Sequence, residues 1–307
     1  MQSRLSPTQP KPFLIALAMA CVYLFWGGTY LGMKIAIETM PPFLMAGVRF
    51  LIAGNALYIV RRLMGDARPA LRQWRDAGIV GGLLLLGGNG LVAWAEQTVP
   101  SSIASLMVAT APLWMAAIGG LTGMSRPGLG GWIGLVVGFS GIAILVLGSK
   151  GSPSGELNPM GIVALLCASV FWASGSLYSR RASQPGSPLL WTGMQMILGG
   201  ALLLTLSLLM GDLKRFDPAL LSARSFAALV YLMIGGSIIG YTAYIWLLKN
   251  AETTLVSTYA FVNPVVAVLL GWLVAGEQIG GNALAAAAVI IAAVVIITLA
   301  RPKPVKK

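Results

Sequence analysis

The sequence contains no histidine, only two cysteines and few charged residues, and each shortage excludes a class of function. Without histidine, the commonest general base and metal ligand of proteins is missing. Cys21 and Cys167 both lie inside apolar runs, and their spacing fits neither a disulfide framework nor a metal motif. Charged residues make up 10% of the chain, whereas soluble domains carry about 25%. With 57% apolar residues, the chain must be covered largely by lipid.

The chain also lacks the motifs of an ATP-driven pump or an enzyme. No G-x-x-x-x-G-K-[ST] motif is present, which excludes direct use of ATP through a Walker A loop. No acidic residue falls in the middle of an apolar run, where proton relays commonly place one. Uniport, exchange and proton coupling through Glu96 all stay open. We expect no cofactor and no metal site, and the lack of paired carboxylates argues against a membrane-embedded enzyme.

The net charge of +12 raises the question of nucleic acid as a partner. The basic residues, however, sit in short clusters between apolar runs, such as Arg61-Arg62 and Arg180-Arg181, and form no basic domain outside the membrane. This placement suits lipid headgroups and the positive-inside rule. We therefore expect no nucleic-acid partner.

Ten segments are apolar and long enough to span a bilayer, for which about 20 residues are needed. They cover residues 13–33, 42–60, 77–95, 101–123, 129–148, 158–179, 188–210, 225–248, 253–275 and 281–300. The short connections carry Pro, Gly or charged residues, which interrupt helices. The predicted fold class is an all-α integral membrane protein.

The basic residues of the connections predict the orientation. With the N-terminus in the cytoplasm, fifteen Lys and Arg lie on the cytoplasmic side and five on the outer side, while Arg49 lies within a helix. The five are Lys34, Lys150, Lys214, Arg215 and Arg224. Both termini are therefore predicted to be cytoplasmic.

An internal repeat relates the two halves of the chain. A shift of 146 residues aligns Cys21 with Cys167 and Trp26 with Trp172, and a shift of 152 aligns Trp94 with Trp246. Further matches are Phe25 with Phe171, Pro42 with Pro188, Gly47 with Gly193, Gly54 with Gly200, Gly88 with Gly240, Pro112 with Pro264 and Gly119 with Gly271. Because each repeat has five helices, the second must insert upside down, as in many transporters.

The repeat also predicts the domain organisation. We expect a cytoplasmic N-terminal segment (1–12), a first repeat (13–148), a linker (149–157), a second repeat (158–300) and a basic cytoplasmic tail (301–307).

Polar and aromatic side chains recur on single faces of the predicted helices, for example Trp26 and Tyr30 one turn apart. Such groups are costly in lipid and should face the bundle or a wet cavity, although bonds between packed helices would equally account for any one of them. We predict a central substrate-binding cavity. The residues expected to line it are Trp26, Tyr30, Asn89, Trp94, Trp172, Ser176, Tyr241, Tyr244, Tyr259 and Asn263.

Four further residues are predicted to act in gating. Pro112 and Pro264 lie at matching places inside apolar segments, where proline removes a backbone hydrogen bond and bends a helix. Arg49 needs a partner inside the membrane, and Glu96 near the same outer face is the candidate. Arg49 would act as an outer gate or as an anchor for a substrate carboxylate; a structural ion pair or a cap on backbone carbonyl groups is the alternative. Glu277 is expected to face water at a helix end.

The sequence resembles the drug/metabolite transporter superfamily, specifically the ten-helix exporters with two EamA domains and, within them, the YedA-like proteins. The stretches that carry the resemblance are 26–30, Pro41-Pro42 through Arg49-Phe50, 99–102, 111–113, 263–266 with Gly271, and Gly276-Glu277. The resemblance implies export of amino acids or related small metabolites and drugs across the bacterial inner membrane, through a central cavity with aromatic side chains.

The expected function is therefore a secondary transporter that works by alternating access, as a monomer, with a small-molecule substrate and membrane lipid as its partners. A translocator of nucleotide sugars or sugar phosphates with the same fold is the alternative. Such anions would favour several basic residues in the cavity, and only Arg49 qualifies.

Overall fold

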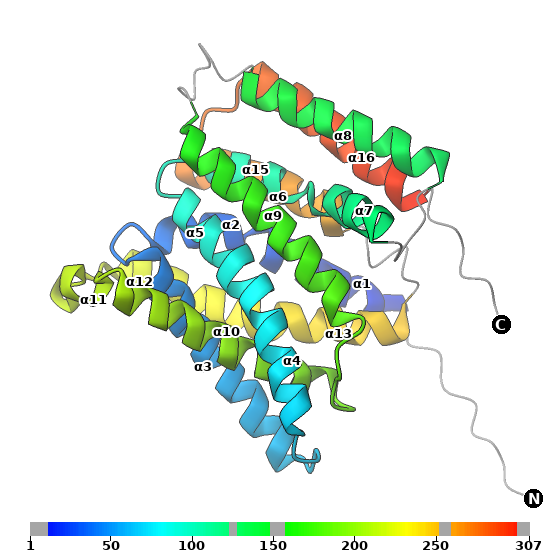
Figure 1. Cartoon of the computed structure of the whole chain (residues 1–307). Coiled ribbons are helices and arrows are strands. Elements are labelled where there is room, and N and C mark those ends of the chain that lie inside the picture. The colour runs from blue at the N-terminus through cyan, green and yellow to red at the C-terminus, as the bar shows by residue number, and fades with distance from the viewer. Residues whose placement is uncertain (1–11, 123–127, 148–156, 252–258, 300–307) are drawn as a thin grey trace, which may run out of the picture.

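The computed structural model describes residues 12–122, 128–147, 157–251 and 259–299, and every regular element in these ranges is a helix (Figure 1). The elements of the first half are α1 (Pro12–Gly27), α2 (Thr29–Ala36), α3 (Pro42–Leu63), α4 (Leu71–Gly81), η1 (Gly82–Gly90), α5 (Leu91–Ala95), α6 (Ser101–Val108), α7 (Ala111–Leu121) and α8 (Leu129–Leu147). Those of the second half are α9 (Pro159–Ser179), α10 (Pro188–Leu209), α11 (Asp212–Arg215), η2 (Pro218–Leu220), α12 (Ala223–Tyr231), η3 (Leu232–Ile239), α13 (Gly240–Asn250), α15 (Tyr259–Ala275) and α16 (Gly281–Leu299).

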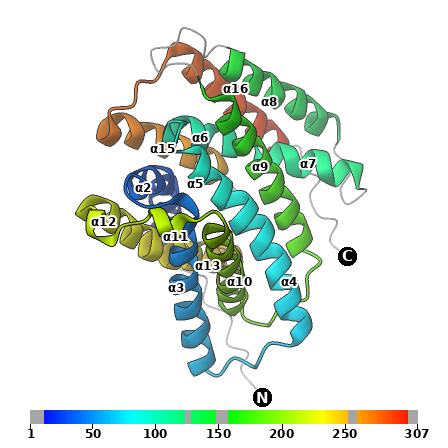
Figure 2. The same ribbon diagram turned by 60° about the vertical axis from the view of Figure 1, so that its left-hand side comes forward.

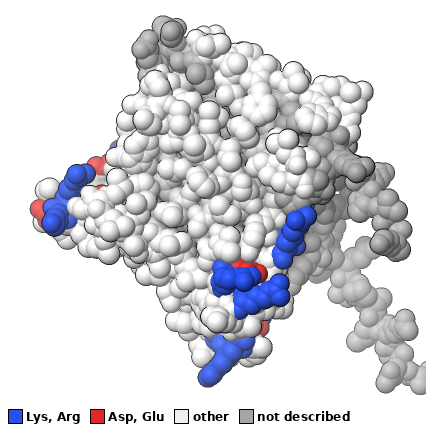
Figure 3. Space-filling view, in the orientation of Figure 1, with Lys and Arg blue, Asp and Glu red and all other residues white. Residues whose placement is uncertain are grey.

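Seven helical segments are long and apolar enough to cross a membrane, and three shorter apolar helices bring the number of apolar segments among the described residues to ten. The prediction of an all-α membrane protein is confirmed. Figure 3 shows Lys and Arg at separate ends of the molecule, with an uncharged surface between them. The third predicted span begins six residues late, because Leu71 already starts α4 despite the charged residues of its first turns.

Proline and short polar side chains fix the helix starts. Proline occupies the first turn of α3, α9 and α10, where its missing N–H costs no hydrogen bond. The Asn158 side chain accepts a hydrogen bond from the Met160 amide at 2.9 Å and caps α9. Ser187 does the same for α10 through the Leu190 amide.

Two helix ends carry the same four residues, Leu-Met-Gly-Asp, at 63–66 after α3 and at 209–212 after α10. Gly65 and Gly211 both have positive φ, 92° and 75°, a conformation that favours glycine and ends each helix in the same way. This identical segment, separated by 146 residues, is part of the repeat that the sequence analysis missed.

Several spans are interrupted rather than straight. The first span breaks at Gly28, and the fourth at residues 109–110 between α6 and α7. Pro112 therefore stands in the first turn of α7, not inside a continuous helix as predicted, whereas Pro264 is inside α15. The third and eighth spans contain the π-helical segments η1 and η3 at corresponding places of the repeat. Short π-helical stretches are frequent at functional sites.

Helices α3 and α10 cross through glycines that belong to the repeat. A Cβ atom on Gly54 would lie 2.9 Å from the Gly193 carbonyl oxygen, and one on Gly200 would lie 3.1 Å from the Gly47 carbonyl oxygen. Since Gly47 corresponds to Gly193 and Gly54 to Gly200, the two contacts are exchanged by the repeat, and the helices run antiparallel. Glycine permits this close approach of backbones. The arrangement is the one expected for two halves of opposite orientation (Figure 2).

Candidate substrate site and gates

The indole of Trp26 binds the π-helical segment η3. Its Nε1 donates a hydrogen bond to the Gly236 carbonyl oxygen at 3.0 Å. Gly240 follows one turn later, and a Cβ atom there would lie 2.5 Å from the same Nε1. Only glycine at position 240 therefore leaves room for the indole. A π-helical turn displaces its carbonyl groups from the regular α pattern, which provides an acceptor for Trp26.

Three tyrosines surround Trp26. Its ring centroid lies 5.2 Å from that of Tyr241, 5.1 Å from Tyr244 and 5.2 Å from Tyr259, and the Tyr241 and Tyr259 contacts are edge-to-face. Four predicted binding residues, contributed by α1, α13 and α15, thus form one aromatic cluster. Asn263, one turn beyond Tyr259 on α15, is buried, and its Oδ1 atom has no hydrogen-bond partner among the described residues. An unsatisfied buried amide next to aromatic rings is a feature of a ligand site.

The second half of the repeat places Trp172 in the same way. A Cβ atom on Gly88 in η1 would lie 3.0 Å from the Trp172 ring, as one on Gly240 would meet Trp26. Next to Gly88, Asn89 donates to the Leu84 carbonyl oxygen at 3.3 Å, and Ser176 donates to that of Trp172 at 2.7 Å. These two polar groups are satisfied within their own helices. The repeat therefore yields two matching tryptophan–glycine contacts, but a tyrosine cluster around only the first.

Tyr30 and Trp94, the remaining predicted binding residues, are partly buried and pack against the main hydrophobic core. Neither has a ring contact with Trp26 among the described residues.

Arg49 contacts η3 and not Glu96, its predicted partner. The residue is 3% exposed, its Nε donates to Ser237 Oγ at 2.9 Å, and its Nη2 lies 3.1 Å from the position of a Cβ on Gly236. Within the described residues it forms no ion pair with Glu96, so the suggested pairing is wrong. Arg49 and Trp26 instead bind neighbouring residues of η3, Ser237 and Gly236. A buried guanidinium beside an aromatic cluster is suited to bind a carboxylate.

The carboxylate of Glu277 closes one end of the molecule. It accepts hydrogen bonds from the Ser101 amide at 2.7 Å, Ser101 Oγ at 2.8 Å and the Ser102 amide at 3.0 Å. Glu277 thus caps the N-terminus of α6 from the end of α15, where the helix dipole favours an anion. Glu277 lies beyond the end of α15, as expected, but its carboxylate is partly buried and bound to the start of α6. We call this end, which also contains connections 37–41 and 96–100, the Glu277 end.

At the opposite end, the Asp66 end, two carboxylates bind within and between the connections of the two halves. Asp66 pairs with Arg61, whose Nη2 lies at 2.7 Å, and this hydrogen-bonded guanidinium holds the pKa of Asp66 below its ordinary value. Asp76 accepts a hydrogen bond from the Ser183 amide at 2.8 Å and so ties α4 to the segment before α10. Sequence reasoning used Arg61 only to predict the orientation and assigned no role to Asp66, Asp76 or Ser183.

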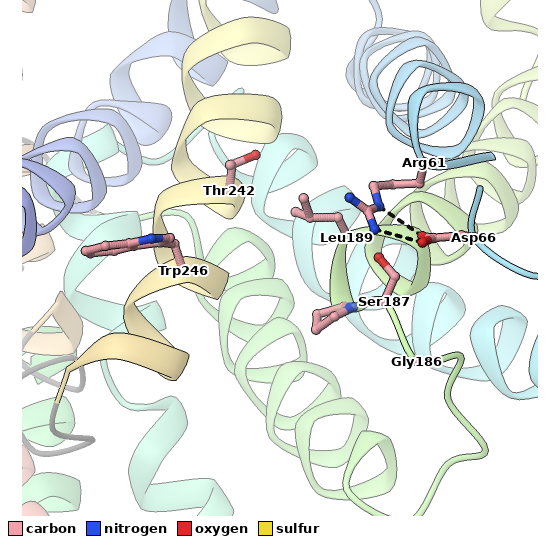
Figure 4. Close-up of a pocket in the computed structure, with 8 residues that line it drawn as sticks. Arg61, Asp66, Gly186, Ser187, Leu189, Thr242 and Trp246 are labelled. Atoms are coloured by element: carbon pink, nitrogen blue, oxygen red, sulfur yellow. Dashed lines mark hydrogen bonds and ion pairs between the residues drawn. The ribbon is translucent and has the colours of Figure 1, made fainter. Parts of the chain in front are cut away.

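A pocket of about 310 Å³ opens beside Asp66, between α3, α10 and α13 (Figure 4). It is lined by Arg61, Asp66, Gly186, Ser187, Pro188, Leu189, Thr242 and Trp246. None of the ten predicted binding residues lines it. Thr242 and Trp246 extend from α13, whose opposite face carries Tyr241 and Tyr244 toward Trp26. The pocket therefore adjoins the aromatic cluster across a single helix.

The place that corresponds to this pocket at the Glu277 end is filled. Thr242 corresponds to Gly90 and Leu189 to Phe43 in the repeat. A Cβ atom on Gly90 would lie 2.8 Å from Leu203 and 3.5 Å from Phe43, and Phe43 is buried. The two ends of the molecule are thus built from related segments and packed differently.

The comparison with protein families decides the identity. The model of the EamA-like transporter family matches the chain twice, over residues 13–147 and 159–299. The chain belongs to the EamA-like transporter family.

Relatives and a solved structure agree with this assignment. The inner membrane transporter YedA of Escherichia coli (strain K12) is 40% identical over 285 residues, 92% of this chain and 90% of YedA. Protein PecM of Dickeya dadantii is 28% identical and covers 84% of each chain, and transporter YoaV of Bacillus subtilis is 23% identical over 88% of this chain and 91% of its own length. One crystal structure covers 93% of this chain and 96% of its own at 22% identity, with a TM-score of 0.62, which shows the fold.

Membership in this family makes the protein a transporter of the inner membrane, and it implies a small molecule as the substrate. The domain boundaries and the roles of the individual site residues stay predictions.

Proposed function

We propose that the protein exports amino acids or related small metabolites and drugs across the inner membrane by alternating access. The observation that carries the proposal is the unequal packing of the two related ends: a pocket opens at the Asp66 end, and its counterpart at the Glu277 end is filled by Phe43 and Leu203. In a transporter with inverted halves, exchanging the conformations of the two halves opens the opposite end.

The orientation follows from the charges of the connections. The Asp66 end holds Arg61, Arg62, Arg180 and Arg181 and is the cytoplasmic side by the positive-inside rule. The structure is then the form closed to the outside. In our proposal the hinges for the exchange are the break before Pro112 and the helix position of Pro264, which lacks an N–H group, with Glu277 as the outer latch.

For substrate recognition, the aromatic cluster and Arg49 are the strongest candidates. Trp26 and its three tyrosines offer ring faces and edges to an apolar or aromatic side chain. Among the described residues, Arg49 Nε donates to Ser237 and the guanidinium lies over the Phe50 ring, 4.6 Å from its centroid. In our proposal the remaining N–H groups bind the carboxylate of the substrate. A single buried arginine fits the one carboxylate of an amino acid better than the several charges of a sugar phosphate.

The proposal is tested by transport in liposomes that contain the purified protein. Vesicles are preloaded with a panel of labelled amino acids, and release is compared with protein-free vesicles, with and without a pH gradient. We expect release of a subset of the panel, and a loss of most of that release in Trp26→Ala and in Trp172→Ala.

The matched control is Trp272→Ala, since Trp272 on α15 is 58% exposed and belongs to the lipid-facing surface. Full activity in both Trp26→Ala and Trp172→Ala would remove the aromatic site from the proposal. Absence of release for the whole panel, from folded protein, would exclude those amino acids as substrates.

A further inference from the structure

The carboxyl group of Glu96 is the most unusual polar group of the described residues. Glu96 ends α5 at the Glu277 end and is 0% exposed. In the part of the chain that the structure describes, neither Oε1 nor Oε2 has a hydrogen-bond partner. A buried carboxylate without partners is too costly to persist, so this carboxyl group is neutral in the closed form.

The charged neighbours of Glu96 show how that state can change. On α2, Lys34 Nζ lies 2.5 Å from the backbone carbonyl oxygen of Glu96, within one side-chain movement of the carboxyl group. Glu277 and Tyr30 also lie within electrostatic range. The part of α9 that packs nearest, at Gly161, and the adjoining Ile162, Ala164 and Leu165 are without charge.

We propose that Glu96 is a proton-binding site, which takes up a proton when the Glu277 end closes and releases it when that end opens. The proposal rests on the alternating access proposed above, since it needs an open form in which water reaches Glu96. In that form the carboxylate is solvated and paired with Lys34. On closure, a hydronium ion transfers its proton to a carboxylate oxygen and leaves as water, and Lys34 moves to the backbone carbonyl.

The electrostatic balance supports this sequence of events. Burial raises the pKa of Glu96 well above the ordinary carboxyl value, Lys34 lowers this pKa, and the nearby Glu277 raises it. Because the closed form binds the proton more tightly than the open form, closure is favoured at acidic pH and is lost as the pH rises through the raised pKa. A more acidic outer solution therefore promotes closure of the Glu277 end.

Infrared spectroscopy of the full chain in lipid nanodiscs measures the proton directly. The carboxylic-acid C=O band is followed from acidic to alkaline pH. We expect one band to disappear with a midpoint well above the ordinary carboxyl value, and to be absent in Glu96→Gln. Lys34→Gln should shift the midpoint to higher pH, because the ammonium group no longer favours the carboxylate. Glu38→Gln is the control, since Glu38 is exposed at the same end.

Movement of the same end is measured by the distance between spin labels at Gln97→Cys and Gln278→Cys, with Cys21 and Cys167 replaced by serine. Both glutamines are exposed. We expect the distance to lengthen as the pH rises, and to stay short in Glu96→Gln, which imitates the protonated form. Glu96→Asp, which keeps the proton site, should retain the pH response.

Four results would overturn the inference. One is a titrating band that survives in Glu96→Gln, and another is a distance in Glu96→Gln that responds to pH as in the parent. The third is a distance that responds to a transported amino acid but not to pH, which leaves alternating access intact and removes only the proton site. A distance that changes under neither condition would overturn alternating access as well.

Discussion

Trp26 and Gly236 are 210 residues apart in the sequence, and the indole Nε1 of one lies 3.0 Å from the carbonyl oxygen of the other. This hydrogen bond joins the first span to the π-helical part of the eighth, and it depends on Gly240 one turn later. The corresponding contact of Trp172 with Gly88 joins the sixth span to the third. The two contacts place the aromatic groups of both halves against π-helical segments.

Gly240→Ala should lower the stability of the protein and its transport rate. The new Cβ would lie 2.5 Å from Trp26 Nε1, so the indole must move from Gly236. We expect a loss of about 1–3 kcal/mol in the free energy of unfolding, as for other overpacked sites. Gly88→Ala should lower the free energy of unfolding by less, because its new Cβ would lie 3.0 Å from the Trp172 ring. Thermal unfolding in detergent measures both. Gly281→Ala, with open space around it, is the control, and equal stability of Gly240→Ala and Gly281→Ala would contradict the prediction.

Replacing Arg49 by lysine should abolish most transport of amino acids while the protein stays folded. Lysine keeps the charge but has no planar fork for a carboxylate and no Nε for Ser237. Ser237→Ala removes the bond alone, and we expect it to cost about 1–3 kcal/mol of stability with weaker effects on transport. Transport rates and unfolding curves, measured for both variants, separate the effect on transport from the effect on stability. Arg224→Lys, at an exposed position, is the control. Normal transport in Arg49→Lys would exclude Arg49 as the carboxylate anchor.

Glu277→Gln should loosen the start of α6. The neutral side chain has one acceptor oxygen in place of two and loses the favourable interaction with the helix dipole. We therefore expect the free energy of opening of the amides at the start of α6 to fall by about 1–3 kcal/mol. Hydrogen exchange of the amides of residues 101–105 reports this directly. Glu38→Gln is the control, because Glu38 forms an exposed ion pair in which Oε1 lies 3.8 Å from Nη2 of Arg224. It should change the free energy of amide exchange by less than about 0.5 kcal/mol. Unchanged exchange in Glu277→Gln would show that the cap is dispensable.

The ion pair of Asp66 predicts a dependence of stability on pH at the other end. Because the guanidinium of Arg61 lowers the pKa of Asp66, its stabilisation is present above the ordinary carboxyl pKa and is lost as the pH falls through the lowered one. The unfolding temperature of the parent should therefore fall further in acid than that of Asp66→Asn, and the difference between them should vanish at low pH. A constant difference over the whole range would show that Asp66 acts by packing alone.

Hydropathy predicted the membrane class and the helices of this chain well, because crossing a bilayer is a requirement that each segment meets by its own composition. The matches of tryptophan, glycine and proline likewise revealed the two halves before any contact was known. The identical Leu-Met-Gly-Asp segments can also be found by comparing the two halves of the sequence, and they add to the evidence for the repeat. By contrast, Arg49 and Glu96 were predicted from the sequence to form a pair, and the described residues of the structure show no such pair.

The sequence by itself determined that this is a helical membrane protein with an internal repeat, since the length and apolarity of a span and the order of its residues are local properties. Only the tertiary structure decided that the carboxyl group of Glu96 has no hydrogen-bond partner among the described residues. It also decided that Arg49 binds Ser237, that Glu277 caps α6 and that Trp26 contacts three tyrosines. Each of these contacts joins residues far apart in the chain. Which side chains meet across packed helices depends on rotation, breaks and π-helical turns, and none of these follows from hydropathy.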